Sequence, residues 1–156
     1  MTSAADLTRL FEALHREGVD YVLVGGQAVR LNGFVRATED VDLLLPVSRE
    51  NGERLKRALS FLESSAELHA EWFAAGPDGE SDNIRMADDI LIDLLFRANG
   101  ESYESLKPHI ESVEFAGVPV RVLNIDGLLK TKTDYREKDI LDRSALLRLK
   151  RGKDGD

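Results

Sequence analysis

The sequence predicts an α+β protein in which helices flank a mixed β-sheet. Short apolar segments typical of strands occur between amphipathic helical segments, but the two do not alternate regularly as they do in a parallel α/β fold. The 156 residues are enough for one domain with a sizeable core. Because no internal repeat or low-complexity segment interrupts the chain, we expect one domain over residues 1–150 and a flexible tail over residues 151–156.

The first half of the chain contains three expected helices and two expected strands. Leu7, Leu10 and Leu14 recur at helical spacing, and Gly18 favours a helix end after them. Ser48 is a suitable N-cap for a later helix. In chain order, these elements are a helix over 4–17, a strand over 21–24, a short helix over 27–32, a strand over 41–45 and a helix over 49–64.

The second half begins after an expected loop over residues 75–80, which contains two glycines and a proline. Apolar runs with turn residues between them predict two pairs of neighbouring strands, and helical patterns follow. These elements are strands over 84–86, 90–96, 113–115 and 118–122 and helices over 125–132 and 138–149.

Composition excludes several classes of function. The formal net charge of −8 argues against a protein that coats nucleic acid nonspecifically, since such binding requires cations at the phosphates. The chain has no cysteine, which excludes disulfides, thiolate metal sites and cysteine nucleophiles. No apolar run approaches the roughly 20 residues that span a bilayer, and the N-terminus lacks the apolar core of a signal peptide. We therefore expect a cytoplasmic protein without a membrane partner.

Basic residues gather near the C-terminus. Residues 130–153 hold nine basic and four acidic side chains, a net charge of +5, whereas the remaining 132 residues carry −13. This asymmetry suggests an anion-facing element attached to an acidic body. Solvated helix faces rich in Lys and Arg are the alternative interpretation.

Asp40 and Asp42 form a pair of carboxylates on an expected strand. Residues two apart on a strand point to the same face, so Val41 and Leu43 would point into the core while both carboxylates lie on the accessible face. Their mutual repulsion calls for a positive partner, and hard oxygen ligands suit Mg²⁺ or Mn²⁺. A solvated strand end that carries two acids explains the same pattern.

Gly25 and Gly26 follow an apolar strand and precede an expected helix. Glycines at such a turn let backbone N–H groups approach a phosphate closely. A tight strand-to-helix turn without a ligand is the alternative. The spacing matches neither the P-loop nor the dinucleotide-binding glycine pattern.

Asp93 interrupts the apolar segment 90–96. A carboxylate in such a strand is unfavourable unless it is exposed at an edge, paired with an arginine or bound to metal. The glycine pair, the carboxylate pair and this third carboxylate together are typical of a two-metal phosphoryl-transfer site.

These residues resemble the nucleotidyltransferase superfamily with the DNA polymerase β-type fold. Val24-Gly25-Gly26-Gln27-Ala28 and Arg36-Ala37-Thr38-Glu39-Asp40-Val41-Asp42 look most like its small prokaryotic branch of AbiEii-type toxins and MNT proteins. Leu128 to Lys132 with Arg136 to Asp142 is similar to that branch's L-x-x-K…R-x-K-D-x-x-D motif. The resemblance covers about residues 20–147. It implies a mixed sheet like the palm of polymerase β.

The resemblance also implies roles for the glycines and the carboxylates. Gly25 and Gly26 would hold the β- and γ-phosphates of a nucleoside triphosphate. Asp40 and Asp42 would bind Mg²⁺ or Mn²⁺ and bridge the triphosphate through the metal. Asp93 would complete the second metal site and help to deprotonate the acceptor hydroxyl.

Basic residues have implied roles in binding the triphosphate. Lys132 is the main candidate for this contact, followed by Arg136 and Lys138. Thr38 and Arg36 would support the loop before the metal-binding strand, and Arg36 would also be within reach of phosphate.

The resemblance implies a structural role for two acids of the C-terminal motif, and the sequence departs from the family at one residue of the glycine turn. Asp139 and Asp142 would organise the closing helices by pairing with nearby basic residues. Gln27 stands where many family members have a serine or another small residue. The chain also has little room for the extra helical region of AbiEii-type toxins.

The expected function is Mg²⁺-dependent transfer of a nucleoside monophosphate from a nucleoside triphosphate to an acceptor hydroxyl, with release of pyrophosphate. The acceptor, which could be a protein, an RNA or a small molecule, and the oligomeric state are left open. A non-catalytic nucleotide-binding regulator or a toxin–antitoxin component on the same fold is the alternative.

Other candidate sites are weaker. His15, His69 and His109 lack metal-ligand spacing and are expected at the surface or at helix ends. Trp72 and Phe73 are expected in the core, with a base pocket as the alternative.

Overall fold

The structure, a computed structural model, describes residues 3–33, 40–74, 83–132 and 136–154. Its α-helices are α1 (Ala4–Arg16), α2 (Gly25–Leu31), α3 (Arg49–Ala58), α4 (Tyr103–Leu106), α5 (Ile125–Thr131) and α6 (Glu137–Asp154). Its strands are β1 (Val22–Val24), β2 (Asp40–Leu44), β3 (Ile84–Ala87), β4 (Leu91–Leu95), β5 (Ile110–Phe115) and β6 (Val118–Leu123). Short 3₁₀ helices are η1 (Leu59–Phe61), η2 (Glu63–Glu67), η3 (Ala70–Phe73) and η4 (Lys107–His109).

The described strands form a six-stranded mixed sheet in the order β3-β4-β2-β1-β6-β5. β1 pairs antiparallel with β2 and parallel with β6, whereas β2 pairs parallel with β4. The outer pairs, β3–β4 and β5–β6, are antiparallel. The predicted α+β fold with a mixed sheet is therefore confirmed. The topology also brings β2 and β4, which are far apart in the sequence, side by side.

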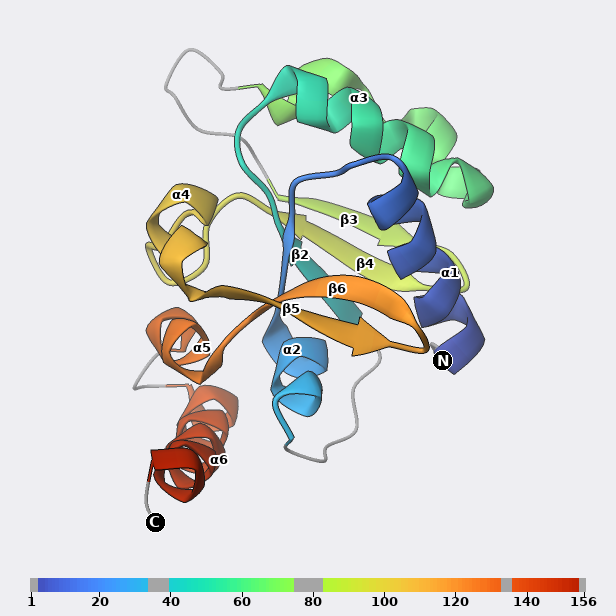
Figure 1. The fold of residues 1–156 in the computed structure, drawn as a ribbon. Helices are drawn as coiled ribbons and strands as arrows, with labels where there is room; N and C mark the ends of the chain where they lie inside the picture. Colours follow the sequence, from blue (N-terminus) through green and yellow to red (C-terminus); the bar gives the residue numbers. More distant parts are fainter. Residues whose placement is uncertain (1–2, 34–39, 75–82, 133–135, 155–156) are drawn as a thin grey trace.

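Helices α1 and α2 both pack against the sheet (Figure 1). α1 and α3 contact each other, and α1 lies against β6. α2 packs against β1 and β2 in the lower part of the view, where α5 and α6 also pack together. Apolar side chains such as Phe11, Leu23 and Leu43 are fully buried between these layers.

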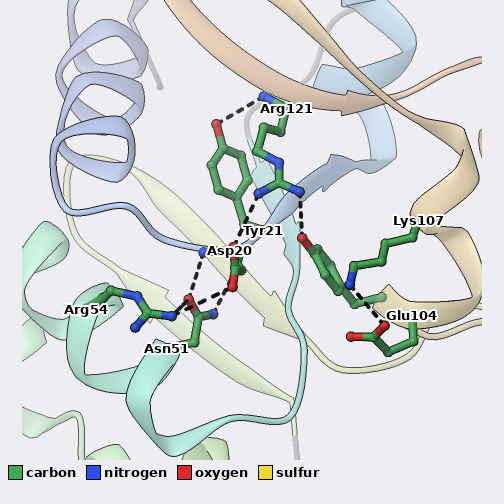
Figure 2. Close-up of polar contacts among 8 residues, drawn as sticks. Asp20, Tyr21, Asn51, Arg54, Glu104, Lys107 and Arg121 are labelled. Carbon is green, nitrogen blue, oxygen red and sulfur yellow. Dashed lines mark hydrogen bonds and ion pairs between the residues drawn. The ribbon is translucent and has the colours of Figure 1, made fainter.

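A polar cluster fixes the start of β1 (Figure 2). The buried Asn51 side chain accepts a hydrogen bond from the Asp20 N–H at 2.7 Å and donates one to the Asp20 carbonyl at 2.8 Å. Arg121 on β6 contacts the Asp20 carboxylate at 3.4 Å, and its backbone N–H donates to the Tyr21 hydroxyl at 3.2 Å. The Arg121 guanidinium also donates to the Tyr103 hydroxyl at 2.6 Å. These bonds join α3 and β6 to the residues that lead into β1.

The segment after Ser48 differs from its prediction. The expected helix over 49–64 ends as an α-helix at Ala58 and continues in tighter 3₁₀ turns, which bury Leu59 and Leu62. Phe73 is buried as expected. The expectation for Trp72 was wrong: its side chain is 44% exposed, because the two consecutive side chains of η3 point in different directions.

The C-terminal helix is longer than expected. α6 continues through residues 151–154, which were expected to belong to the tail. Gly152 lies inside this helix, and one glycine costs only about 1 kcal/mol relative to alanine, too little to end a helix that is already propagating. The loop expected over 75–80 lies outside the described residues. Within the described part of the chain, no helix is long and apolar enough to cross a bilayer.

Candidate active site

The three predicted carboxylates lie together on β2 and β4. Asp40 and Asp42 alternate with Val41 and Leu43, which are fully buried, so both acids project from the other face of the sheet. Asp93 is the register partner of Asp42 across the parallel pair β2–β4. Residues in register on neighbouring strands point to the same side, which places all three acids on one face.

Asp42 and Asp93 are close enough for their carboxyl groups to share a hydrogen bond. Burial raises the pKa of Asp42 from its ordinary value of 3.8 to about 7, and the negative charge of Asp93 adds to this effect. The charge of Asp40 raises this pKa further, while the positive charge of Lys132 lowers it. Near neutral pH the pair therefore tends to keep one proton when no external cation is present.

Gly25 lies directly beside Asp42. The last residue of β1, Val24, is the register partner of Asp42, so the chain enters α2 next to this carboxylate. Gly25 has a φ of +70°, and a Cβ at this position would overlap Asp42 Oδ2 and lie 2.9 Å from Cγ. A side chain here is excluded both by the backbone conformation and by the carboxylate. Gly26 is buried in the first turn of α2.

A cavity of about 370 Å³ opens beside the Asp42 carboxylate. Charged and polar side chains dominate its walls. The polar residues that line it are Asp42, Asn83, Arg97, Asn99, Thr131, Lys132, Arg136 and Asp139, together with Gly25. Three of these side chains are cationic and two are acidic, so the cavity can attract an anion and also present carboxylates to a bound cation.

Lys132 is held between the cavity and α6. Its Nζ lies 3.0 Å from Asp142 Oδ2 and 4.0 Å from Asp139 Oδ1. The Lys132 and Asp142 side chains are only 8% and 4% exposed, so each charge depends on the other for compensation. The predicted pairing of Asp139 and Asp142 with a basic residue is therefore present, and it joins α5 to α6.

Arg85 was not predicted from the sequence. It lies on β3 as the register partner of Asp93, and its guanidinium contacts Asp93 Oδ1 at 3.7 Å and Asp40 Oδ2 at 3.4 Å. The salt bridge that was left open as an alternative for Asp93 therefore exists. Among the described residues, no three His, Cys, Asp or Glu side chains are arranged as ligands of one metal ion.

The remaining predicted residues divide into two groups. Arg136 lines the cavity, as expected for a phosphate contact. Lys138 is exposed in the first turn of α6 and does not belong to the described lining. Arg36 and Thr38 lie outside the described residues.

Arg97, Asn83 and Asn99 line the cavity but were not identified from the sequence. Arg97 follows soon after β4, the strand that carries Asp93, and this proximity was the signal that could have indicated it. The two asparagines lie in connecting segments whose positions depend on the fold as a whole. No sequence pattern would have identified them.

The fold is shared with solved structures of low sequence identity. TM1012 of Thermotoga maritima, described as a candidate nucleotidyltransferase, has a TM-score of 0.57 at 18% identity, with 91% of this chain and 88% of that chain covered. An antigenic nucleotidyltransferase-like protein of Paracoccidioides brasiliensis has a TM-score of 0.55 at 16% identity, with 94% and 74% covered. ANT(2″)-Ia, solved in complex with adenylyl-2″-tobramycin, has a TM-score of 0.56 at 16% identity, with 99% and 91% covered.

No protein-family model and no curated protein matches the sequence. The structural similarities show that the chain has the fold of nucleotidyltransferases, which confirms the predicted core. At 16–18% identity they establish the fold alone. The specific resemblance to AbiEii-type toxins and MNT proteins stays a prediction.

The close approach of Gly25 to Asp42 predicts a strong effect of a single methyl group. We expect Gly25→Ala to lower the free energy of unfolding by about 1–3 kcal/mol more than Gly117→Ala does. Gly117 is a matched control because it has a similar φ of +81° but nothing within 4 Å of an added Cβ. Urea denaturation followed by circular dichroism measures both values. Equal losses in the two variants would show that the carboxylate does not restrict this position.

The raised pKa of Asp42 predicts that stability depends on pH. The folded protein holds this proton up to about pH 7, whereas the unfolded chain releases it near pH 3.8. The resulting stabilisation is complete below about pH 4 and is lost as the pH rises through about 7. Between pH 5 and pH 8, we expect the free energy of unfolding to fall by roughly 1–3 kcal/mol through this group.

In chelator-containing buffer, the Asp42→Asn variant should lose this pH dependence of the free energy of unfolding. Asp89→Asn, which changes an exposed acid in the β3–β4 turn, should retain the wild-type slope. Denaturant titrations at several pH values compare the three proteins. A wild-type slope in Asp42→Asn would contradict the prediction.

Proposed function

We propose that this protein is a metal-dependent nucleotidyltransferase that transfers a nucleoside monophosphate from a nucleoside triphosphate to an acceptor hydroxyl and releases pyrophosphate. The observation that supports this most directly is that Asp42, in register with Asp93, faces a cavity whose walls also carry Lys132, Arg97 and Arg136. Phosphoryl transfer needs both carboxylates that bind a divalent cation and cationic groups that bind phosphate oxygens.

The chemistry of the carboxylates fits Mg²⁺ or Mn²⁺. Both are hard cations that prefer carboxylate oxygen, and the raised pKa of Asp42 means that the negative charge here is incompletely compensated by the chain itself. Asp42 and Asp93 would hold the metal, and Asp40 would join them after leaving Arg85. When bound, the metal would neutralise charge on the triphosphate and its leaving group.

The chain's own residues would bind and orient the triphosphate. Gly25 lines the cavity, and its lack of a side chain lets the backbone lie against the Asp42 carboxylate, so a bound phosphate group would meet backbone at this point. Lys132, Arg97 and Arg136 would contact phosphate oxygens from the cavity wall. Lys132 is suited to this because its pairing with Asp142 fixes the position of the ammonium group.

The transfer step follows from this arrangement. The acceptor oxygen attacks the α-phosphorus, the bond from that phosphorus to the oxygen that bridges to the β-phosphate breaks, and pyrophosphate leaves with this oxygen. The proton of the acceptor hydroxyl passes to an oxygen of Asp93, whose side chain is 23% exposed and thus accessible. Holding the two reacting groups in line supplies much of the rate acceleration.

The acceptor of the nucleoside monophosphate belongs to one of three classes that can be tested. ANT(2″)-Ia, which has a similar fold, was solved with an adenylylated small molecule. A small-molecule alcohol is therefore the first class to test. A protein hydroxyl and an RNA end are the other two.

The function is tested by incubating the protein with each nucleoside triphosphate and Mg²⁺ or Mn²⁺ in the presence of each acceptor class. Pyrophosphate release and the mass increase of the acceptor are measured together. We expect Asp42→Asn and Asp93→Asn to lower the rate by at least about 100-fold, since each removes a charge needed in the transition state. Asp89→Asn should retain the wild-type rate because this exposed acid lies outside the cavity.

Nucleotide binding measured by calorimetry separates the enzyme from its alternative. Metal-dependent binding that Asp42→Asn weakens, without turnover on any acceptor class, would favour a non-catalytic regulator or a toxin–antitoxin component. Equal, metal-independent binding by the wild type and Asp42→Asn would contradict the proposed site in either form.

The contacts of Arg85 predict that it competes with the metal. We expect Arg85→Gln to bind Mn²⁺ about fivefold more tightly, because the guanidinium no longer occupies Asp40 and Asp93. Electron paramagnetic resonance of unbound Mn²⁺ measures this affinity without nucleotide or turnover. Arg49→Gln, which changes an arginine of similar exposure on α3, is the control. Unchanged or weaker Mn²⁺ binding by Arg85→Gln would contradict the competition.

A further inference from the structure

Helix α6 has two faces with different surroundings. Its inner face buries Asp142, Ala145 and Leu146 against the rest of the protein. Its outer face exposes three large apolar side chains: Ile140 is 45%, Leu141 65% and Leu147 41% exposed. Only two other large apolar side chains in the described residues, Val47 and Trp72, are exposed to a similar degree.

The exposed residues of α6 follow one stripe along the helix. We define the outer stripe as Glu137, Ile140, Leu141, Ser144, Leu147 and Arg151, all of which are exposed. Residues 137, 140, 144, 147 and 151 alternate three and four positions apart, which is the spacing of a helix that packs against another helix. The stripe is acidic at its start, apolar along its middle and basic at its end.

This order is complementary to itself when it is reversed about Ser144. Glu137 and Arg151 lie seven positions before and after Ser144, and Leu141 and Leu147 lie three positions before and after it. An antiparallel second copy would therefore place its Arg151 opposite Glu137 and its Leu147 opposite Leu141. The small Ser144 side chain at the centre would let the two helices approach closely.

We propose that the outer stripe is a self-association surface through which two copies of this chain pair their α6 helices antiparallel about a two-fold axis at Ser144. The contact is isologous, since each copy contributes the same surface and every pair of residues away from the axis occurs twice. Leu141 and Leu147 supply its apolar centre, and Glu137 with Arg151 closes it at both ends. Arg148, opposite Ile140 of the second copy, covers that side chain with its aliphatic stem.

The charge pattern favours a second copy over other occupants. A nucleic acid would require cations along the whole stripe, whereas here its middle is apolar and its start is acidic. A membrane surface would favour basic residues at both ends of an apolar face. A single pair of helices is a small interface, so we expect a dissociation constant in the range of about 10–100 μM.

Sedimentation equilibrium from about 2 to about 500 μM tests the association in the wild type. We expect a monomer–dimer equilibrium whose dissociation constant rises at least about tenfold in Leu141→Glu. Val47→Glu is the matched control, because Val47 is an apolar side chain of comparable exposure (44%) outside α6, and it should leave the equilibrium unchanged. Thermal unfolding verifies that both variants are folded.

Charge exchange tests the antiparallel pairing. Glu137→Arg and Arg151→Glu should each weaken the homodimer, because each places like charges opposite one another. An equimolar mixture of the two variants should associate again, because an antiparallel heterodimer restores two opposite-charge pairs. Parallel pairing of the helices would also restore attraction in the mixture. In a parallel wild-type dimer, however, Glu137 of one copy would face Glu137 of the other, so Glu137→Gln alone would strengthen a parallel dimer.

Cross-linking provides a second measure of the register. The chain contains no cysteine, so Ser144→Cys introduces a single thiol. Oxidation of this variant should give a covalent dimer far faster than oxidation of Lys138→Cys, because Lys138 is exposed but lies outside the stripe. Three results would overturn the proposal. They are a wild type that is still monomeric at about 500 μM, a dimer that persists unchanged in Leu141→Glu, and a dimer that becomes tighter in Glu137→Gln. The association requires neither nucleotide nor metal, so these outcomes are independent of the proposed transferase activity.

Discussion

Two carboxylates held against each other are the constraint on which the candidate site depends. Asp42 and Asp93 are neighbours on one face of the sheet, because the backbone pairing of β2 with β4 fixes their register. Burial and mutual repulsion raise the pKa of Asp42 to about 7, so the fully ionised pair is unfavourable without a positive partner. Two cationic side chains of the protein partly compensate this charge: Lys132 lies on the cavity side, and Arg85 lies on the edge strand β3. They differ in burial: the Lys132 side chain is 8% exposed and the Arg85 side chain 57%.

The buried cation links the acidic site to the C-terminal helix. Lys132 has its own partners in Asp142 and Asp139, which lie on the inner face of α6. Removing Lys132 or Asp142 would deprive a buried charge of its close partner, a change that costs roughly 3–5 kcal/mol in typical proteins. The docking of α6 and the charge balance of the carboxylates are thus parts of one electrostatic arrangement. Arg85, which is exposed and contacts its acids at 3.4 Å and 3.7 Å, can leave at much lower cost.

The sequence was sufficient for the local features of this arrangement and insufficient for the non-local ones. Alternation with Val41 and Leu43 correctly placed Asp40 and Asp42 on the open face, because a strand's period is a local property. The contact of Asp93 with Asp42 depended on which strands become neighbours, and only the joint occurrence of the motifs and the resemblance to a family suggested it. Arg85 could not be found in this way, since its role arises from the antiparallel pairing of β3 with β4. Lys138 was assigned to phosphate through the resemblance to the family, yet it lies exposed on α6 outside the described lining of the cavity.

The basic C-terminal segment has more than one function in the structure, which its net charge of +5 conceals. Lys132 and Arg136 belong to the cavity, whereas Arg148 and Arg151 lie on the exposed surface of α6. The inner face of α6 carries Asp142, the partner of Lys132. A second copy bound at the outer stripe would therefore leave the Lys132–Asp142 pair untouched. It would reduce the fraying of α6 by covering its exposed apolar side, and so would favour the same docked position of the helix that the buried ion pair requires. Self-association and the integrity of the cavity would then act in the same direction, although neither surface contributes a residue to the other.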